Sequence, residues 1–173
     1  MAFTIRTARD SDREAAGAVL QRSFAEYERE YPEWGPLLHA GNPMAKAAPE
    51  GELLVAEMNG AIVGCVVYVP PGLSRNPVFE KEWAALRYMA VDPAHRGHGI
   101  SRALAEECAR RTARDGAKRL ALFTSPAMKI AIALYKRMGF EFQREIPPVY
   151  GMAAELYLLT VSTPQSHRAL GRT

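Results

Sequence analysis

One stretch decides the fold of this chain: Leu86-Arg87-Tyr88-Met89-Ala90-Val91-Asp92-Pro93-Ala94-His95-Arg96-Gly97-His98-Gly99-Ile100-Ser101. An apolar run leads through a proline turn and a loop with two glycines into a helical pattern, which predicts a strand followed by a helix N-terminus. The first N–H groups of a helix lack intrahelical partners, and the helix dipole is positive at that end. The loop from Arg96 to Ser101 is therefore suited to binding an anion, and its glycines let the backbone approach that anion closely.

Two common phosphate-binding loops do not fit this stretch. A nucleoside triphosphatase loop ends in Gly-Lys-Ser/Thr, whereas the second glycine here is followed by Ile100-Ser101-Arg102. A dinucleotide-binding loop needs a third glycine, where this chain has Arg102, and an acidic residue at the end of the next strand, which here runs over 120–124 without one. A glycine pair alone is more often a plain turn, so its surroundings must decide its role.

A helix with clear start and end signals is predicted downstream of the loop. Ser125 is suited to the N-cap, Pro126 to the first helical position, and Gly139 to the left-handed position after the last turn, with Phe140 packing back. Apolar side chains recur at helical spacing: Ile130, Ala131, Leu134, Tyr135 and Met138. By composition alone, Tyr135 would be one more packing residue on this face.

The glycine loop resembles the pyrophosphate loop of the GCN5-related N-acetyltransferase (GNAT) superfamily. The pattern of that loop is Gln/Arg, two residues, Gly, one residue, Gly/Ala, and this chain has Arg96, Gly99 and Ser101 at the three defined positions. Ser101 departs from the pattern but is small and keeps its own N–H. The physics of an anion at a helix N-terminus is therefore retained.

The downstream helix resembles the second GNAT signature, which ends in Leu-Tyr, three residues, Gly-Phe. Leu134-Tyr135 and Gly139-Phe140 match it, with Ala131 in place before them. Met128 stands where the family often has Asn, so a side-chain amide contact to the pantetheine arm is expected to be missing. Two signatures in the right order, about forty residues apart, are far more specific than either alone.

The resemblance implies an α/β fold over most of the chain, from Phe3 to Val161. Its central sheet is mixed and mostly antiparallel, with parallel, splayed fourth and fifth strands and helices on both faces. The resemblance also implies acetyl-CoA as co-substrate and a primary amine as acceptor. By the same resemblance, Tyr135 faces the sulfur, and the expected cofactor-binding residues are those of a strand bulge, Met89, Ala90 and Val91, and of the loop, Arg96, Gly97, His98, Gly99, Ile100 and Ser101.

The chemistry of acetyl transfer needs a neutral amine, support for an oxyanion and a donor to the departing thiolate. With reference pKa values near 10 for tyrosine and about 8.5 for a thiol, full proton transfer from Tyr135 is uphill by roughly 2 kcal/mol. Tyr135 is therefore expected to act mainly as a hydrogen-bond donor.

The general base stays open at this stage. Some GNAT members carry a Glu on the fourth strand, but the strand over 84–91 has no carboxylate. A water wire to backbone carbonyls, or one of several nearby carboxylates, would serve: Glu26, Glu28, Glu30, Glu33, Glu80 or Glu82. Aromatic residues that could form the acceptor pocket, or simply pack, are Tyr27, Tyr31, Trp34 and Tyr150. His95 and His98 make a poor zinc site because no third ligand is near them in the sequence, so no metal is expected.

Composition sets the broad class of protein. A chain of 173 residues with 48% hydrophobic content can bury one core, and we expect a single domain over residues 1–161 with a disordered tail over 162–173. The net charge of +3, with dispersed Lys and Arg, gives no nucleic-acid-binding stripe. No apolar stretch reaches membrane-spanning length, and Cys65 and Cys108 are expected to be reduced, which favours the cytoplasm.

The remaining elements follow from local signals. Ser11 and Glu14 predict a capping box at the start of the first helix, and Asn59-Gly60 predicts a type I′ hairpin turn. The other expected elements are a strand over 3–8, a short helix over 36–40, a loop over 41–51, hairpin strands over 53–58 and 61–69, a connection over 73–83, a helix over 99–114, and closing strands over 140–144 and 154–161 around a loop over 146–151.

The sequence leaves the acceptor open among small amines, antibiotics, amino acids, and protein N-termini or lysines, and it leaves a homodimer open. A non-catalytic acyl-CoA sensor or scaffold is the alternative to an enzyme, because the fourth strand lacks a carboxylate. A donor longer than acetyl is a third reading. Tyr135 favours the enzyme.

Overall fold

A computed structural model describes residues 2–32, 35, 51–149 and 151–162. Seven strands form one sheet in the order β1-β2-β3-β4-β5-β7-β6, in which only the β4–β5 pair is parallel. The elements are β1 (Thr4–Thr7), η1 (Asp10–Asp12), α1 (Arg13–Glu28), β2 (Glu52–Met58), β3 (Ala61–Val69), β4 (Ala84–Val91), η3 (Pro93–His95), α4 (Ile100–Arg114), β5 (Arg119–Thr124), α5 (Lys129–Met138), β6 (Glu141–Val149) and β7 (Met152–Thr160). The expected α/β sheet with a parallel central pair is confirmed.

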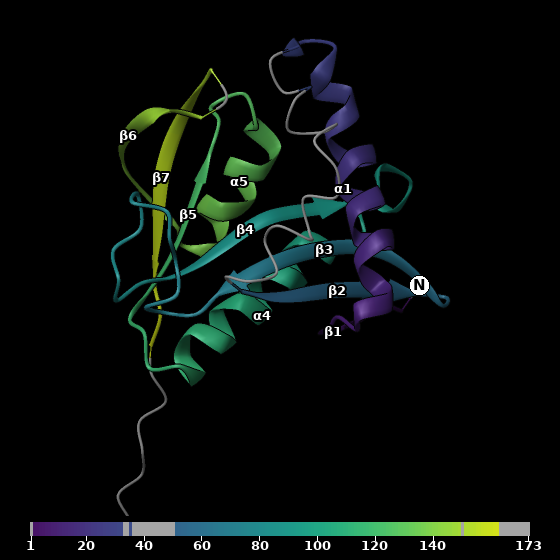
Figure 1. The fold of residues 1–173 in the computed structure, drawn as a ribbon, viewed down its shortest axis with the longest axis horizontal. Helices are drawn as coiled ribbons and strands as arrows, with labels where there is room; N and C mark the ends of the chain where they lie inside the picture. The colour runs from purple at the N-terminus through teal and green to yellow at the C-terminus, as the bar shows by residue number, and fades with distance from the viewer. Residues whose placement is uncertain (1, 33–34, 36–50, 150, 163–173) are drawn as a thin grey trace, which may run out of the picture.

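The helices cover both faces of the sheet (Figure 1). On one face, α1 packs Val19 and Leu20 against β3 and β4. On the other face, α4 packs Ile100 and Leu104, and α5 adds Tyr135. Each strand of the central sheet therefore buries both of its faces, which explains why β2, β3 and β4 are apolar runs rather than alternating patterns.

Local signals placed most turns correctly. Asn59 and Gly60 adopt φ values of 52° and 78°, as a type I′ turn requires, and join β2 to β3. Gly139 ends α5 with φ 99°, and the Phe140 N–H donates to the Tyr135 carbonyl.

Two helix starts differ from expectation. Helix α5 begins at Lys129 and not at Pro126 behind a Ser125 N-cap, because the Ser125 hydroxyl accepts from the Ala127 N–H and closes a separate turn. The expected Ser11–Glu14 capping box is also wrong. Instead the Asp12 carboxylate accepts from the Arg9 N–H at 2.7 Å, so a short 3₁₀ turn precedes α1.

The closing strands are longer than expected. Strand β6 continues through Pro147 and Pro148 to Val149, so the expected loop over 146–151 is largely strand. Prolines are tolerated there because β6 is an edge strand with a register shift between Ile146 and Val149. The described ranges contain no helix long and apolar enough to cross a membrane.

Several expectations fall outside the described residues. These are the short helix over 36–40, most of the loop over 41–51, Glu33, Trp34 and Tyr150, and the tail from 163 onward. The single domain over 1–161 and the disordered tail stay predictions.

Candidate functional site

A β-bulge interrupts β4 at the centre of the sheet. Cys65 pairs with Ala90 and Val67 with Arg87, so two steps along β3 correspond to three along β4. The extra residue is accommodated at Tyr88, whose φ of 54° lies in the left-handed region that bulky side chains rarely adopt. A bulge frees backbone groups from the ladder, as the resemblance implied for Met89, Ala90 and Val91, and it re-aims the neighbouring side chains.

Strands β4 and β5 separate already before the bulge, after Ala85. Their parallel pairing covers only Ala84 with Leu120 and Ala85 with Ala121. A cavity of about 860 Å³ opens between the diverging strands, a volume typical of small-molecule sites. Its walls come from the C-terminal part of α1, from β4, β5 and α5, from the start of α4, and from the hairpin of β6 and β7.

The start of α4 presents bare backbone to this cavity. Gly97 and Gly99 have φ values of 84° and 77°, Gly99 is the N-cap residue of α4, and a Cβ at either glycine would meet no described atom within 4 Å. Only glycine adopts this conformation without strain, and the open space leaves the helix N–H groups approachable. Of the expected cofactor-binding residues, all line the cavity except His98, whose Nδ1 lies 3.0 Å from the His95 carbonyl oxygen.

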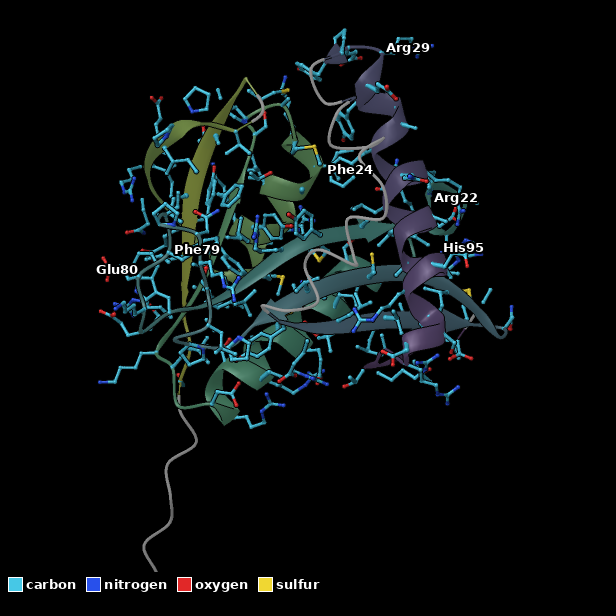
Figure 2. The ribbon with its side chains drawn as sticks, viewed as in Figure 1. Arg22, Phe24, Arg29, Phe79, Glu80 and His95 are labelled. Carbon is cyan, nitrogen blue, oxygen red and sulfur yellow. The ribbon has the colours of Figure 1, made fainter. Side chains whose placement is uncertain are left out.

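Two ion pairs tie the loop to α1. Arg22 donates to Asp92 at 2.7 and 3.0 Å, and Arg96 pairs with Glu26 at 2.8 Å one helical turn further along. Figure 2 shows Arg22 of α1 near His95 of η3, and the carboxylate of Asp92 lies close to both of these side chains. Burial opposes ionisation of Asp92, but the Ala94 N–H and Arg22 outweigh it and lower the pKa of its carboxyl.

Tyr135 lies on α5 at the wall of the cavity. The residue is only 6% exposed, and its ring packs on Phe140 with centroids 5.5 Å apart. Burial, with a smaller contribution from Cys108, raises the pKa of its phenol well above the ordinary value. The hydroxyl therefore stays protonated and able to donate across the physiological pH range.

Comparison with known proteins identifies the family. The Acetyltransferase (GNAT) family profile matches residues 14–140. This chain belongs to the GNAT acetyltransferase family. The resemblance of its two signatures is thereby confirmed.

Individual GNAT relatives are distant. The chain is 32% identical over 87 residues to N-acetyltransferase family 8 member 3 of Rattus norvegicus, covering 50% of this chain and 37% of the relative. It is 34% identical over 92 residues to an uncharacterized N-acetyltransferase of Methanocaldococcus jannaschii, covering 53% of this chain and 40% of the relative. The aligned segment thus spans less than half the length of these curated relatives.

Solved GNAT structures share the fold. The ribosomal-protein-S18-alanine N-acetyltransferase of Escherichia coli superposes with a TM-score of 0.67 at 23% identity, covering 96% of this chain and 98% of that one. A GNAT family acetyltransferase from Brucella melitensis, solved in complex with acetyl-CoA, gives a TM-score of 0.62 at 23% identity, covering 93% and 89%. At these identities the likeness shows the architecture alone.

Within this GNAT cavity, the acceptor-side expectations separate into two groups. Tyr27, Glu26 and Glu30 line the cavity from the end of α1. Tyr31, together with Glu28, Glu80 and Glu82, is not part of its wall. Among the described residues, no cluster of three His, Cys, Asp or Glu could hold a metal ion.

Sequence reasoning missed several residues of the cavity wall, among them Arg87, Tyr88 and Phe123. Arg87 is the only charged residue in the otherwise apolar β4. A charge in a buried strand is uncommon without a specific role, so this residue carried a usable signal.

Proposed function

We propose that this protein is an N-acetyltransferase that moves the acetyl group of acetyl-CoA to a primary amine. The observation that carries the proposal is the single cavity in which the β4 bulge, the open N-terminus of α4 and Tyr135 meet. Family membership, the N-acetyltransferase names of the curated relatives and the acetyl-CoA bound to the Brucella melitensis protein support it.

In this proposal each part of the cavity has one task. The pyrophosphate of acetyl-CoA binds the N–H groups at the start of α4, over Gly97 and Gly99. The pantetheine arm follows β4 between the diverging strands, and backbone groups of Met89, Ala90 and Val91 bind the arm and polarise the thioester carbonyl. Arg96, His98, Ile100 and Ser101 complete the expected loop contacts, although His98 is turned toward His95.

Tyr135 donates a hydrogen bond to the thiolate as the carbon–sulfur bond breaks. Since burial raises the pKa of its phenol, the donor is not lost by ionisation, and full transfer of its proton to sulfur becomes less favourable still. Water then completes the protonation of CoA. This arrangement stabilises charge where it develops in the transition state.

The amine must lose a proton before or during attack. Of the carboxylates considered above, Glu26 and Glu30 are the described ones that line the cavity, and Glu26 is held by Arg96. Glu30, or water bound to backbone carbonyls, is therefore the proton acceptor we favour. The acceptor is a small-molecule or peptide amine, nucleic acid and membrane play no part, and the protein works in the cytoplasm.

The test is to incubate the whole chain with acetyl-CoA and a panel of amines and to follow the release of free thiol. We expect amine-dependent thiol release together with acetylated product. Tight binding of CoA without turnover on any amine would instead identify an acyl-CoA sensor or scaffold.

A further inference from the structure

Two consecutive residues of β3, Val63 and Gly64, face the same helix. The step from Ala56 to Glu57 along β2 corresponds to two steps along β3, so Val63 is the extra residue of a second β-bulge. Val63 belongs to the buried cluster under α4, and a Cβ on Gly64 would meet side chains of α4 as well. A regular strand would have placed these two neighbours on opposite faces of the sheet.

The space above Gly64 has no room for a side chain. A Cβ there would lie 2.9 Å from Cγ2 of Ile100 and 3.3 Å from Cδ1 of Leu104, whereas ordinary contacts begin at 3.4 Å. Ile100 and Leu104 are 2% and 0% exposed, so neither side chain can turn aside into solvent. The φ of Gly64 is not positive. The position therefore requires glycine for its lack of volume and not for its backbone conformation.

Gly64 lies beneath both ends of the loop that leads into α4. The loop leaves the sheet after Val91, which pairs with Gly64, and the Asp92 N–H donates to the Val63 carbonyl at 2.8 Å. It returns to the sheet at Ile100, the first residue of α4, whose side chain lies over Gly64. The contact between Ile100 and Gly64 thus sets how close to the sheet α4 begins.

The ion pairs with α1 restrain the same loop from its outer side. They join Arg22 to Asp92 and Arg96 to Glu26, and both arginines are exposed. Exposed ion pairs contribute little and yield easily, whereas a close-packed interior does not yield without strain. The buried contact at Gly64 is therefore the stiffer of the two restraints on the start of α4.

We propose that Gly64 is a positioning residue that places the pyrophosphate site by letting α4 begin close against β3. This inference rests on the proposed binding of acetyl-CoA, which is held both at the start of α4 and at the β4 bulge. Such contacts must keep their relative positions to within about 0.5 Å. A methyl group on Gly64 would push Ile100 and the neighbouring N–H groups outward by about half an ångström, while the bulge at Tyr88 packs on the other face and stays in place.

The experiment measures the Kd for CoA by isothermal titration and the Tm by thermal unfolding, with the titrations made where every variant is folded. Gly64→Ala should raise the Kd for CoA about tenfold, because donors to the pyrophosphate are displaced. Its Tm should fall as well, because the core is overpacked. Ala117→Val is the matched control, since Ala117 is 5% exposed and lies at the opposite end of α4. It should lower the Tm and leave the Kd for CoA within about twofold.

The same substitution should act in the opposite direction when Ile100 is shortened. Ile100→Ala leaves a gap over Gly64, so the start of α4 loses its support and CoA binding weakens. Adding Gly64→Ala to that variant fills the gap and should improve the Kd for CoA by about threefold or more. Removal of volume alone gives no such reversal. This pair decides the matter even if Gly64→Ala alone fails to fold.

An unchanged Kd for CoA in folded Gly64→Ala, or no recovery of affinity in the Ile100→Ala background, would overturn the inference and leave the proposed function standing. Equal losses of CoA affinity in Gly64→Ala and Ala117→Val would overturn it too, because crowding anywhere under α4 would then suffice. A wild-type protein that does not bind CoA would overturn the proposed function itself.

Discussion

Gly99 and Gly116 stand at opposite ends of α4 and form a matched pair for testing the anion site. Their φ values are 77° and 75°, and a Cβ at either position would meet no described atom within 4 Å. Substitution by Ala therefore costs each the same left-handed strain, about 1–2 kcal/mol, and no internal clash. In a chain of this length, that strain lowers Tm by about 2–8 °C.

Only Gly99 adjoins the proposed pyrophosphate site, so the two variants should differ in cofactor binding. We expect Gly99→Ala to weaken CoA binding by at least tenfold, about 1.4 kcal/mol, and Gly116→Ala to leave it unchanged. Thermal unfolding without ligand measures the strain, and isothermal titration with CoA measures the affinity. Equal CoA affinity in two folded variants with equal Tm shifts would refute the placement of the anion at the start of α4.

Three further predictions concern residues around the cavity and in the core. Tyr135→Phe should lower kcat by about 10- to 100-fold with an unchanged Kd for acetyl-CoA, and wild-type turnover with chemistry limiting would return Tyr135 to a packing role. Arg22→Gln removes the ion pair that holds the loop through Asp92 and should weaken CoA binding by about three- to tenfold. Because Arg22 is exposed, the unfolding free energy should change by about 1 kcal/mol or less. An unaltered CoA affinity, measured by titration, would show that this ion pair does not position the loop for CoA. Burial raises the pKa of the Cys65 thiol to about 12, so the contribution of Cys65 to stability should be constant below the ordinary thiol pKa and fall between about pH 9 and 12. Unfolding free energies from denaturant titrations should therefore fall less steeply with pH in Cys65→Ala than in the wild type. Parallel pH dependences of the two proteins would contradict this prediction.

Much of the fold could be predicted from local signals, because turns and helix starts are determined by short segments of sequence. The glycines of the loop predicted the start of α4, and Asn59-Gly60 predicted the β2–β3 turn. The same reasoning failed at Ser125, where a good N-cap residue closes a turn of its own and α5 starts later. It failed again at Pro147 and Pro148, because only the sheet order reveals that β6 is an edge strand.

The candidate site depends more on long-range structure. The cofactor side was predicted through two family signatures, and all of its expected residues except His98 line the cavity. The acceptor side was predicted in part, because the candidates Glu26, Tyr27 and Glu30 do line the cavity. Tyr88 was missed, because its position depends on the pairing of β4 with β3. No local pattern in the residues of β4 marks a bulge of this kind.

Acetyl transfer itself is tested most directly with acetyl-CoA labelled in its acetyl group. The whole chain is mixed with this donor and an amine, and the label is followed by mass spectrometry while free thiol is counted. The account predicts that the label moves to the amine nitrogen with one thiol released per product, and that this requires both the protein and the amine. Labelled acetyl-CoA that is bound but stays intact, or that is cleaved to acetate without any labelled amine, would contradict the account.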